Sequence, residues 1–565
     1  MASERYPHVN NANRYARDVV SGKIAACRWV KLTCQRHLDD LGREKDADFL
    51  YRFDKRSGED ICRFAEMLPH IKGEWADKHE YIVYEPWQCF IWAVVFGWKR
   101  KSDGTRRFRE VYCEIPRKNS KSTMGAIAGL YMLTVDGEAG AEVYSGATSL
   151  KQALEIFRPA WKMAKGADGF MDQFGINLGG TDTNPGNIFC LSTDSRFEPV
   201  IAKPGDGSSP SCALIDEYHE HKTPDLYNTM RTGQGARIQP LTIIVTTGGT
   251  DTSGPCYDKR IQVTRILEGT IHNEELFGII YGRDPEDDWT DFETWKKANP
   301  NYGISVYHDY LWSQYRDAIQ ITSLQNVNRC KHLNDWLNAS TAWINIDKWT
   351  QCKDLEMELA DFAGQDCWIA IDLASKIDMV ALVLMVKRGT ELCMFGKYYL
   401  PEAVVWAHGN DHYQRWAKEG YLTVTPGERT DYQFIEDDVL SFNDQFRIRE
   451  VVFDPKEAGY LITRLQDKLT APCVEFPQNA AHISEPMKEF EARYMARTLR
   501  HDDNPILNWM AQNVTQRLQG KYYMPGKDRA ELKIDGIVAA IMALARATVN
   551  EDKESIYETR GVICL

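Results

Sequence analysis

The sequence lacks any hydrophobic run of the length that a membrane-spanning helix requires. The apolar stretch Phe90–Trp98 is shorter than the roughly 18 residues needed for such a helix, and the cations Lys99 to Lys101 follow it directly. Residues 1–17 are polar and carry no apolar core of a signal peptide. We therefore expect a protein that has no membrane partner.

Cysteines at the spacing of metal or redox motifs are also missing. The chain has 14 cysteines, scattered from Cys27 to Cys564, and none of them belongs to a Cys-x-x-Cys pair. Zinc sites and disulfide frameworks need cysteines at close or regular spacing. We therefore predict that these cysteines are reduced core residues of a cytoplasmic protein.

An excess of positive charge is missing as well, because 81 acidic residues outnumber 68 Lys and Arg and give a net charge of −13. Nucleic acid would therefore have to be bound by local basic patches. One basic cluster flanks Asp103-Gly104, a dipeptide typical of hairpin turns. Its members are Lys99, Arg100, Lys101, Arg106, Arg107 and Arg109. We expect them at a hairpin tip, where they either contact phosphates or are merely solvated.

The composition, 43% hydrophobic and 26% charged, is that of a globular protein, and 565 residues suffice for two or three domains. In the first half, buried strands alternate with helical segments, which predicts a doubly wound parallel sheet. The predicted strands are Val111–Ile115, Ala141–Ala147, Ser211–Ile215 and Leu241–Thr246. After a linker at 361–366, three further strands predict a mainly antiparallel sheet. They are Cys367–Leu373, Val380–Lys387 and Glu391–Leu400.

A phosphate-binding loop is predicted between the strand 111–115 and a helix over 124–133. Its residues are Pro116, Arg117, Lys118, Asn119, Ser120, Lys121, Ser122 and Thr123. A loop that leaves a strand and opens a helix presents free N–H groups and the helix dipole to an anion. Lys121-Ser122 matches the end of a nucleotide-binding loop, in which the lysine contacts the β- and γ-phosphates and the hydroxyl contacts Mg²⁺. That pattern usually has glycine where Ile115 and Ser120 stand.

A second element supports nucleotide hydrolysis. The apolar strand ending at Ile215 is followed by two carboxylates, Asp216 and Glu217. In nucleotide hydrolases the first such carboxylate holds Mg²⁺, and the second orients and deprotonates the attacking water. Either element is common alone, but the combination in this order predicts an ATP hydrolase.

Two further elements fit this prediction. The amide of Gln88, upstream of the loop, can form paired hydrogen bonds with an adenine edge, although Pro86 followed by Gln88 is also an ordinary helix start. Thr247 follows the strand 241–246 in a Thr-Thr-Gly-Gly sequence. This position suits a sensor beside the γ-phosphate, and a simple turn would have the same sequence.

The C-terminal half predicts a metal-dependent nuclease. Asp372 and Asp454 each stand at the end of an apolar strand, and Asp535 stands at the start of an apolar helix over 537–547. Three such carboxylates can hold two divalent ions about 3.5–4 Å apart, which activate water and stabilise the leaving oxygen. Mg²⁺ and Mn²⁺ are both suited to such oxygen ligands. Asp378 and Glu457 are weaker candidates, and the turn His501–Pro505 is more consistent with an architectural role.

These motifs together resemble the large terminase subunit of tailed bacteriophages. The resemblance rests on Pro116–Ser122, Ala213–His219, Gln239–Gly249, the Trp87-Gln88 element and the Lys-Ile-Asp-Gly sequence at 533–536. It implies a P-loop NTPase-type sheet followed by an RNase H-like nuclease with a mixed sheet. It also implies that Arg117 corresponds to the family's arginine that senses or stabilises the γ-phosphate. Lys118 could share the work of Lys121.

The resemblance gives the chain an expected organisation. The segments are an N-terminal helical region (1–60), an ATPase core (61–255), a helical lid and linker (256–360), the nuclease (361–548) and a tail (549–565). The implied partners are double-stranded DNA, the small terminase subunit and the portal of a procapsid, on which the protein would form a homo-oligomeric ring. The implied location is the cytoplasm of the bacterial host.

Two other functions remain open from the residues alone. A cellular helicase-like or repair ATPase–nuclease would carry similar motifs, but helicases of that type need a second motor domain, which the sequence after Thr250 does not suggest. A catalytically decayed packaging scaffold is the other alternative. It is disfavoured because Lys121, Asp216, Glu217 and the three nuclease aspartates are all present.

Overall fold

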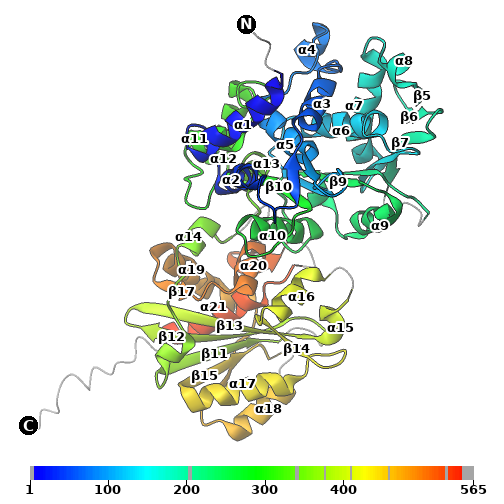
Figure 1. Ribbon diagram of the computed structural model, residues 1–565. Helices are drawn as coiled ribbons and strands as arrows, with labels where there is room; N and C mark the ends of the chain where they lie inside the picture. Colours follow the sequence, from blue (N-terminus) through cyan, green and yellow to red (C-terminus); the bar gives the residue numbers. More distant parts are fainter. Residues whose placement is uncertain are drawn as a thin grey trace, which may run out of the picture. The chain divides into compact units, whose positions relative to one another are not determined.

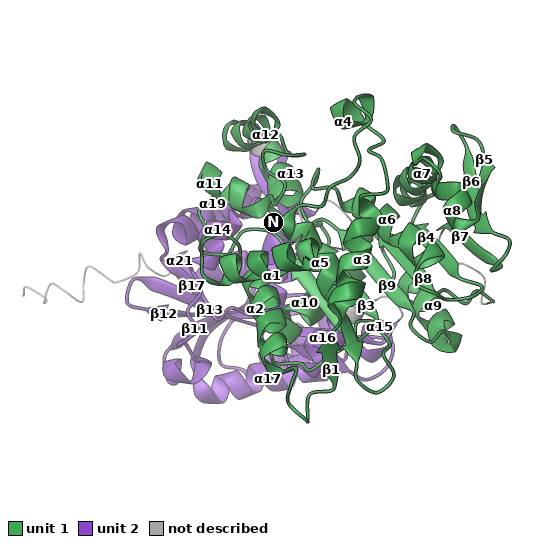
Figure 2. Ribbon diagram, turned by 45° about the horizontal axis from the view of Figure 1, so that its top comes forward, with its two compact units in different colours: residues 1–336 green, residues 337–565 purple. Residues whose placement is uncertain are grey.

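The protein is described by a computed structural model that covers residues 5–201, 207–337, 343–373, 377–407, 410–455, 459–527 and 532–549. The chain divides into two compact units, Met1–Trp336 and Leu337–Leu565 (Figure 2). The boundary therefore falls inside the segment expected to form the lid and linker. In the described part of the chain, no helix is long and apolar enough to cross a bilayer.

The first unit contains an eight-stranded sheet with the strand order β10-β3-β9-β8-β4-β7-β6-β5 (Figure 1). The strands from β10 to β7 are mutually parallel, and β6 and β5 continue the sheet in antiparallel pairing. The bounds are β3 (Glu110–Glu114), β4 (Glu142–Ala147), β5 (Ile176–Gly180), β6 (Pro185–Cys190), β7 (Ser195–Ile201), β8 (Cys212–Asp216), β9 (Leu241–Thr246) and β10 (Leu276–Ile280). The four predicted strands correspond to β3, β4, β8 and β9, whereas β5 to β7 and β10 were not predicted.

Alternation along the central strands explains why both faces of this sheet are covered. Val111 and Cys113 of β3 belong to the large core on one face, and Tyr112 between them belongs to the core on the other face. Ile243 and Ile244 of β9 divide in the same way. Strands that are buried on both sides have continuous apolar sequences, which is why these strands were recognisable.

Helices pack against both faces of the first sheet (Figure 1). They are α1 (Pro7–Val20), α2 (Arg28–Arg43), α3 (Lys55–Ala65), α4 (Gly73–Asp77), α5 (Pro86–Gly97), α6 (Lys121–Thr134), α7 (Leu150–Gly166), α8 (Phe170–Phe174), α9 (Asp225–Gly233), α10 (Pro255–Leu267), and the short helices η1 (Tyr218–Glu220) and η2 (Gln234–Ala236). Helix α1 packs on α5, and α2 packs on β10. The N-terminal helices therefore share the core of the first sheet.

A smaller helical layer completes the first unit. It consists of α11 (Phe292–Ala298), α12 (His308–Gln320) and α13 (Thr322–Leu333), and we call it the lid. The lid has its own apolar core, which includes Trp295, Leu311 and Leu333. A separate core allows these helices to hold their own arrangement beside the sheet.

The basic cluster differs from the prediction. A hairpin is present, formed by β2 (Trp98–Arg100), which also pairs with β1 (Tyr51–Phe53). Arg106 and Arg107 beyond its turn are 0% and 1% exposed. Arg106 forms a two-bond ion pair with Asp136, with N–O distances of 2.6 and 3.2 Å. Arg106 therefore belongs to a core ion pair, and Arg109 is buried as well, so the members past the turn do not form an exposed DNA-binding patch.

Arg107 is buried in the same manner. Its guanidinium pairs with Asp40 at 2.7 Å and with Glu274, and it stacks over Tyr51 at 4.5 Å from the ring centroid. The planar guanidinium is suited to such combined pairing and stacking. The acids come from α2 and from the segment before β10, so this cluster ties the N-terminal helices to the sheet.

The second unit contains a mixed sheet with the order β14-β13-β12-β11-β15-β16, and β17 pairs with β13. Strands β11, β12 and β13 are antiparallel, and β15 joins β11 in parallel. The bounds are β11 (Asp366–Asp372), β12 (Val380–Arg388), β13 (Glu391–Pro401), β14 (Leu422–Thr425), β15 (Arg447–Phe453), β16 (Cys473–Glu475) and β17 (Leu499–His501), with a separate hairpin of β18 (Val514–Gln519) and β19 (Tyr522–Lys527). The mixed sheet that the resemblance implied is confirmed. The mainly antiparallel sheet predicted from the strand pattern is wrong beyond β11, β12 and β13, because β14, β15, β16 and β17 pair in parallel.

Helices cover both faces of the second sheet as well. The bounds are α14 (Ile346–Thr350), η3 (Leu359–Phe362), α15 (Glu402–Val405), α16 (Asp411–Lys418), α17 (Tyr432–Gln445), α18 (Gly459–Lys468), α19 (Ala480–Ala496), α20 (Pro505–Asn513) and α21 (Asp535–Val549). Helix α21 packs on β11 and β12, and α17 packs on β15 (Figure 1). The thirteen cysteines in the described ranges are free, and all except Cys473 are buried, as the sequence predicted.

We predict that Arg106→Ala lowers the free energy of unfolding of the first unit by about 3–5 kcal/mol, because it leaves the Asp136 carboxylate buried without its partner. Urea unfolding followed by tryptophan fluorescence measures this change. Lys101→Ala, which removes an exposed cation of the same cluster, is the control and should change stability by less than about 0.5 kcal/mol. Equal effects of the two substitutions would contradict the buried ion pair.

Candidate functional site

The predicted phosphate loop joins the end of β3 to the start of α6. Two of its residues are left-handed, Lys118 with φ 68° and Ser120 with φ 60°. This region favours glycine, and a larger residue there costs of order 1–2 kcal/mol. Ser120 stands where the usual pattern has glycine, so the loop keeps the glycine-type backbone without the glycine. At position 120 the loop therefore differs from the usual pattern in the type of residue but not in the backbone conformation.

Lys121 is the buried cation of this loop. Its Nζ donates to the carbonyl oxygens of Ile115 at 2.7 Å and Pro116 at 3.3 Å. Burial lowers the pKa of the Lys121 ammonium, and the nearby carboxylates of Glu217 and Asp216 oppose this shift. Lys118 is exposed. The geometry therefore puts Lys121, and not Lys118, beside the acidic pair.

The acidic pair lies at the carboxyl end of β8. Asp216 is 2% exposed, and one of its carboxylate oxygens accepts a hydrogen bond from the Glu217 backbone N–H at 2.9 Å. Burial, together with the nearby Glu217, raises the pKa of Asp216 to about 7. Glu217 follows in a left-handed conformation, with φ 44°. Such a strained backbone beside a carboxylate is common at functional positions.

His219 connects this pair to the predicted sensor. Its Nδ1 lies 3.2 Å from Glu217 Oε2 and 3.1 Å from Thr246 Oγ1. Thr247 is buried, and its hydroxyl lies 3.4 Å from the same nitrogen. No role was predicted for His219 from the sequence, although it ends the segment Ala213–His219 that resembles the terminase family. Only the adjacency of β8 and β9 shows that it can link the two strand ends.

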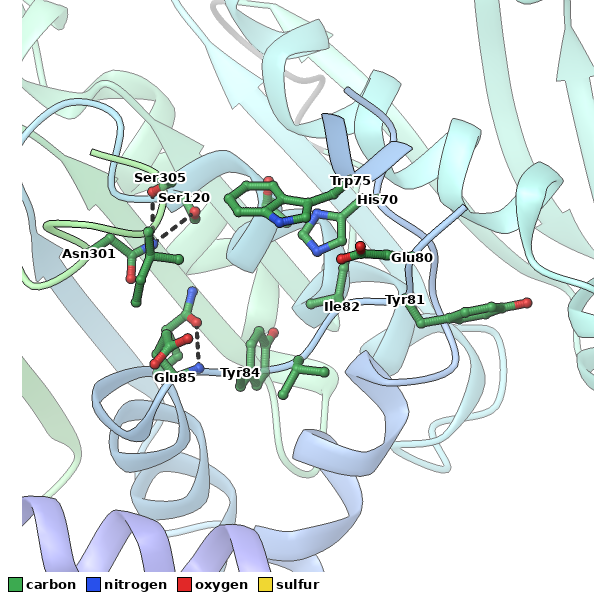
Figure 3. Close-up of a pocket in the computed structure, with 14 residues that line it drawn as sticks. His70, Trp75, Glu80, Tyr81, Ile82, Tyr84, Glu85, Ser120, Asn301 and Ser305 are labelled. Atoms are coloured by element: carbon green, nitrogen blue, oxygen red, sulfur yellow. Dashed lines mark hydrogen bonds between the residues drawn. The ribbon is translucent and has the colours of Figure 1, made fainter. Parts of the chain in front are cut away.

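A cavity of about 180 Å³ opens beside the loop (Figure 3). Ser120 and Thr123 line it from the loop and α6, Gln88 lines it from α5, and Asn301 and Ser305 line it from the lid. The rings of His70 and Trp75 lie on another side, with centroids 4.9 Å apart. A pocket with aromatic rings on one wall and amides and hydroxyls on others can accept a planar heterocycle.

Gln88 has a structural role that the sequence presented only as an alternative. Its Oε1 accepts the Glu85 backbone N–H at 2.9 Å, and Glu85 and Gln88 form a reciprocal capping box at the start of α5. Gln88 also lines the cavity. The side chain can therefore cap the helix through its oxygen and offer its amide NH₂ to the pocket.

The remaining predicted loop residues differ in how exposed they are to solvent. Arg117 is exposed, and its backbone N–H donates to the Lys331 carbonyl at 2.9 Å. Asn119 is fully buried. Ser122 lies half-buried in the first turn of α6, where the helix dipole favours an anion.

The nuclease candidates converge at one end of the second sheet. Asp372 ends β11, and Asp454 directly follows β15. These strands are parallel neighbours with Ile371 opposite Phe453, so the two carboxylates leave the sheet at the same edge. Asp535 begins α21, which packs on β11. The structure thus brings the three predicted aspartates together.

The electrostatics of this cluster are those of crowded carboxylates. Burial, and then the nearby Asp535, raises the pKa of Asp372, which the Gln478 amide hydrogen bond at 2.7 Å opposes. Burial and the nearby Asp378 raise the pKa of Asp535 to about 6. Within the described ranges, Asp454 Oδ1 and Asp535 Oδ2 are buried and accept no hydrogen bond. Buried anionic oxygens without donors are suited to a metal cation.

Asp378, a weaker candidate in the sequence, also belongs to this cluster. Its carboxylate helps to raise the pKa of both Asp372 and Asp535, and it pairs with Lys533 at 2.6 Å. Among the described residues, no three acidic, His or Cys side chains stand in ligating geometry around a common point. Asp378 is paired with Lys533, and Asp372 accepts a hydrogen bond from Gln478. Glu457 lies outside the described residues.

The turn at His501–Pro505 is architectural. His501 is buried and stacks on Trp349 with centroids 4.4 Å apart, and its Nε2 lies 3.0 Å from the Trp349 carbonyl. Asn504 caps α20 by accepting hydrogen bonds from Ile506 and Leu507. These contacts leave the turn with a packing role beside β17.

Comparison with known proteins identifies both halves. The family "Terminase large subunit, ATPase domain" matches residues 86–265, and "Terminase large subunit, endonuclease domain" matches residues 270–551. The chain is 41% identical over 383 residues to Protein YmfN of Escherichia coli (strain K12), covering 65% of this chain and 84% of that protein. The chain belongs to the large terminase subunit family.

Other relatives in the family are more distant. The large terminase subunit of Enterobacteria phage HK97 is 24% identical over 455 residues, which cover 77% of this chain and 85% of that protein. The crystal structure of the HK97 bacteriophage large terminase covers 86% of this chain and 99% of its own, with 22% identity and a TM-score of 0.43.

The family decides between the alternatives that the sequence left open. As a large terminase subunit, the protein is an ATP hydrolase and a DNA endonuclease that uses nucleotide and divalent metal. A cellular helicase-like ATPase–nuclease and a decayed scaffold are thereby set aside. The two active centres correspond to the two halves of the chain predicted from its motifs.

We predict that the two roles of Gln88 can be separated. Gln88→Glu keeps the oxygen that caps α5 but removes the amide NH₂, so the KM for ATP should rise on the order of tenfold with little loss of stability. Gln88→Ala should raise KM and also lower the melting temperature, because the cap is lost. ATPase kinetics and thermal unfolding measure the two effects. An unchanged KM in both variants would remove Gln88 from nucleotide binding.

Proposed function

We propose that the loop around Lys121 binds ATP with Mg²⁺ and that Glu217 is the base for hydrolysis. Lys121 contacts the β- and γ-phosphates, and the backbone N–H groups from Asn119 to Thr123 contribute to the phosphate site. Asp216 and Ser122 hold the magnesium ion. The observation that carries this proposal is the buried Lys121 ammonium beside the two acids at the end of β8.

The surrounding residues have roles consistent with their positions. Arg117 is exposed at the outer side of the loop, where its guanidinium can reach a γ-phosphate. Thr247 lies at the end of β9 and is linked through His219 to Glu217, which suits a sensor of the γ-phosphate. Gln88 recognises the base from the pocket, and Lys118 has an auxiliary role at most.

We propose that Asp372, Asp454 and Asp535 hold two divalent ions, Mg²⁺ or Mn²⁺, with Asp378 as an additional ligand. The unpartnered buried oxygens of Asp454 and Asp535 support this assignment. When bound, the ions supply an activated water and charge stabilisation for phosphodiester cleavage. Gln478 holds the Asp372 carboxylate in orientation, and Lys533 holds Asp378.

We infer that the two activities serve packaging of double-stranded viral DNA into a procapsid, followed by cutting of the concatemer. The partners implied by the family are the small terminase subunit and the portal protein, on which several copies would act as a ring in the cytoplasm of the bacterial host. Family membership supports these partners.

We predict that Lys121→Ala and Glu217→Gln each reduce ATP turnover at least a hundredfold, because they remove phosphate binding and the base respectively. Mn²⁺-dependent cutting of plasmid DNA should stay measurable in both. Asp172→Asn, which changes an exposed acid on α8 of the same unit, is the control and should keep normal turnover. Normal ATP hydrolysis by Lys121→Ala would refute the assigned site.

We predict the converse for the nuclease. Asp454→Asn should abolish plasmid cutting while ATP turnover persists, because a neutral amide binds divalent ions far more weakly than a carboxylate. Chelation of divalent ions should stop cutting by the unmodified protein. Asp502→Asn, which changes a half-buried acid near β17 outside the cluster, is the matched control. Undiminished cutting by Asp454→Asn would exclude that residue from the metal site.

A further inference from the structure

Four buried asparagines lie in or beside the phosphate loop, and three of them were not among the predicted site residues. Asn119 of the loop is 0% exposed, and Asn299, Asn301 and Asn334, from the two edges of the lid, are 1%, 2% and 3% exposed. A buried amide is costly unless both its oxygen and its nitrogen are hydrogen-bonded. The hydrogen-bond partners of these amides therefore show how the phosphate loop is connected to the lid.

Asn119 is the centre of this connection. Its Oδ1 accepts the Asn301 backbone N–H at 2.9 Å, and its Nδ2 donates to Asn299 Oδ1 at 2.9 Å. The same Nδ2 lies 3.1 Å from the carbonyls of Pro116 and Arg117 within the loop. One side chain thus binds the loop backbone on one side and the lid on the other.

A second set of contacts runs beside the nucleotide cavity (Figure 3). Asn301 Nδ2 donates to Ser120 Oγ at 3.2 Å and to Ser305 Oγ at 2.9 Å. Ser305 in turn donates to the Lys118 carbonyl at 2.6 Å. The lid therefore contacts both left-handed residues of the loop, Lys118 and Ser120.

A third set joins the lid to the sensor. Asn334 Oδ1 accepts the Gly248 backbone N–H at 2.8 Å, and its Nδ2 donates to the Tyr281 carbonyl at 2.7 Å. Gly248 is closely packed here, since an added Cβ would lie 2.9 Å from the Asn334 backbone. The Arg117 backbone N–H donates to the carbonyl of Lys331 in α13, the helix whose C-cap is Asn334. Helix α13 therefore contacts the loop and the sensor strand at once.

We propose that Asn119 is a positioning residue through which the lid sets the conformation of the phosphate loop. The loop has no glycine at its left-handed positions, so its conformation costs energy that these contacts offset. Without these hydrogen bonds, the loop can adopt other conformations in which its backbone N–H groups no longer point toward the phosphates. ATP affinity is thereby coupled to the position of the lid, through Asn299 and Asn301. This proposal rests on the proposed ATP site.

The first test is ATPase kinetics with Asn119→Ala. The KM for ATP should rise on the order of tenfold, with a smaller fall in kcat, because the bound loop must be ordered at the expense of binding energy. Ser305→Ala, a half-buried and milder change in the lid, should raise KM about threefold in the same direction. It keeps the proposal testable if Asn119→Ala does not fold.

Hydrogen exchange reports the order of the loop and lid backbone directly, which ATPase kinetics does not. In Asn119→Ala, amides of the segments 115–121 and 329–334 should exchange faster, and saturating ATP should restore their protection only in part. The control is Asn328→Ala, which removes an equally buried lid asparagine whose amide bonds only the Gln314 carbonyl among the contacts described. This variant should keep the KM and the protection of 115–121 unchanged.

The outcomes are distinguishable. Normal KM and protection in Asn119→Ala, with only a lowered melting temperature, would overturn the positioning role. An equal rise of KM in Asn328→Ala would do the same, because it would show general loosening of the lid. Lys121→Ala separates the two proposals: normal turnover there refutes the ATP site itself, whereas loss of turnover there with an unaffected Asn119→Ala refutes only the positioning role.

Discussion

The buried ammonium of Lys121, which lies beside Asp216 and Glu217, is the interaction on which the proposed ATPase centre depends. Burial disfavours the charges of Lys121 and Asp216, as the lowered pKa of Lys121 and the raised pKa of Asp216 show. Each is tolerated because the opposite charge is near and because backbone groups bind both ends. The parallel order of β3, β9 and β8 is what delivers the loop, the sensor and the acids to one edge of the sheet.

The loop then requires a second source of order. Glycine would let residues 118 and 120 adopt left-handed backbone at little cost, but the sequence has lysine and serine there. The lid provides the missing constraint through buried amides and carbonyls, which are directional and expensive to break in a dry environment. A phosphate loop without glycines is therefore consistent with an ordered site, provided that the lid stays in place.

Much of this could be predicted from the sequence, and the physical reason lies in local pattern. Strands β8 and β9 were predictable because strands buried on both faces are continuous apolar runs, and because Asp216-Glu217 stands at the end of the run that forms β8. Strand β10 was missed because its five residues are isolated among helices and include Gly278. Arg106 and Arg107 were misjudged because their acids, Asp136, Asp40 and Glu274, are distant in the sequence. The roles of His219 and Asn119 depend likewise on contacts that no spacing reveals.

In both centres candidate acids lie at the carboxyl ends of parallel strands, but the centres differ in where their positive charge comes from. In the first unit Lys121 supplies a fixed cation beside the acids, so the site is electrostatically assembled before any ion arrives. In the second unit Lys533 pairs with Asp378, and the buried oxygens of Asp454 and Asp535 have no donor among the described residues. Crowded carboxylates of this kind repel one another until a divalent cation joins them. The acids of the proposed nuclease centre therefore lack a fixed cation of the kind that Lys121 provides in the first unit, and the proposed divalent ions would supply the missing positive charge.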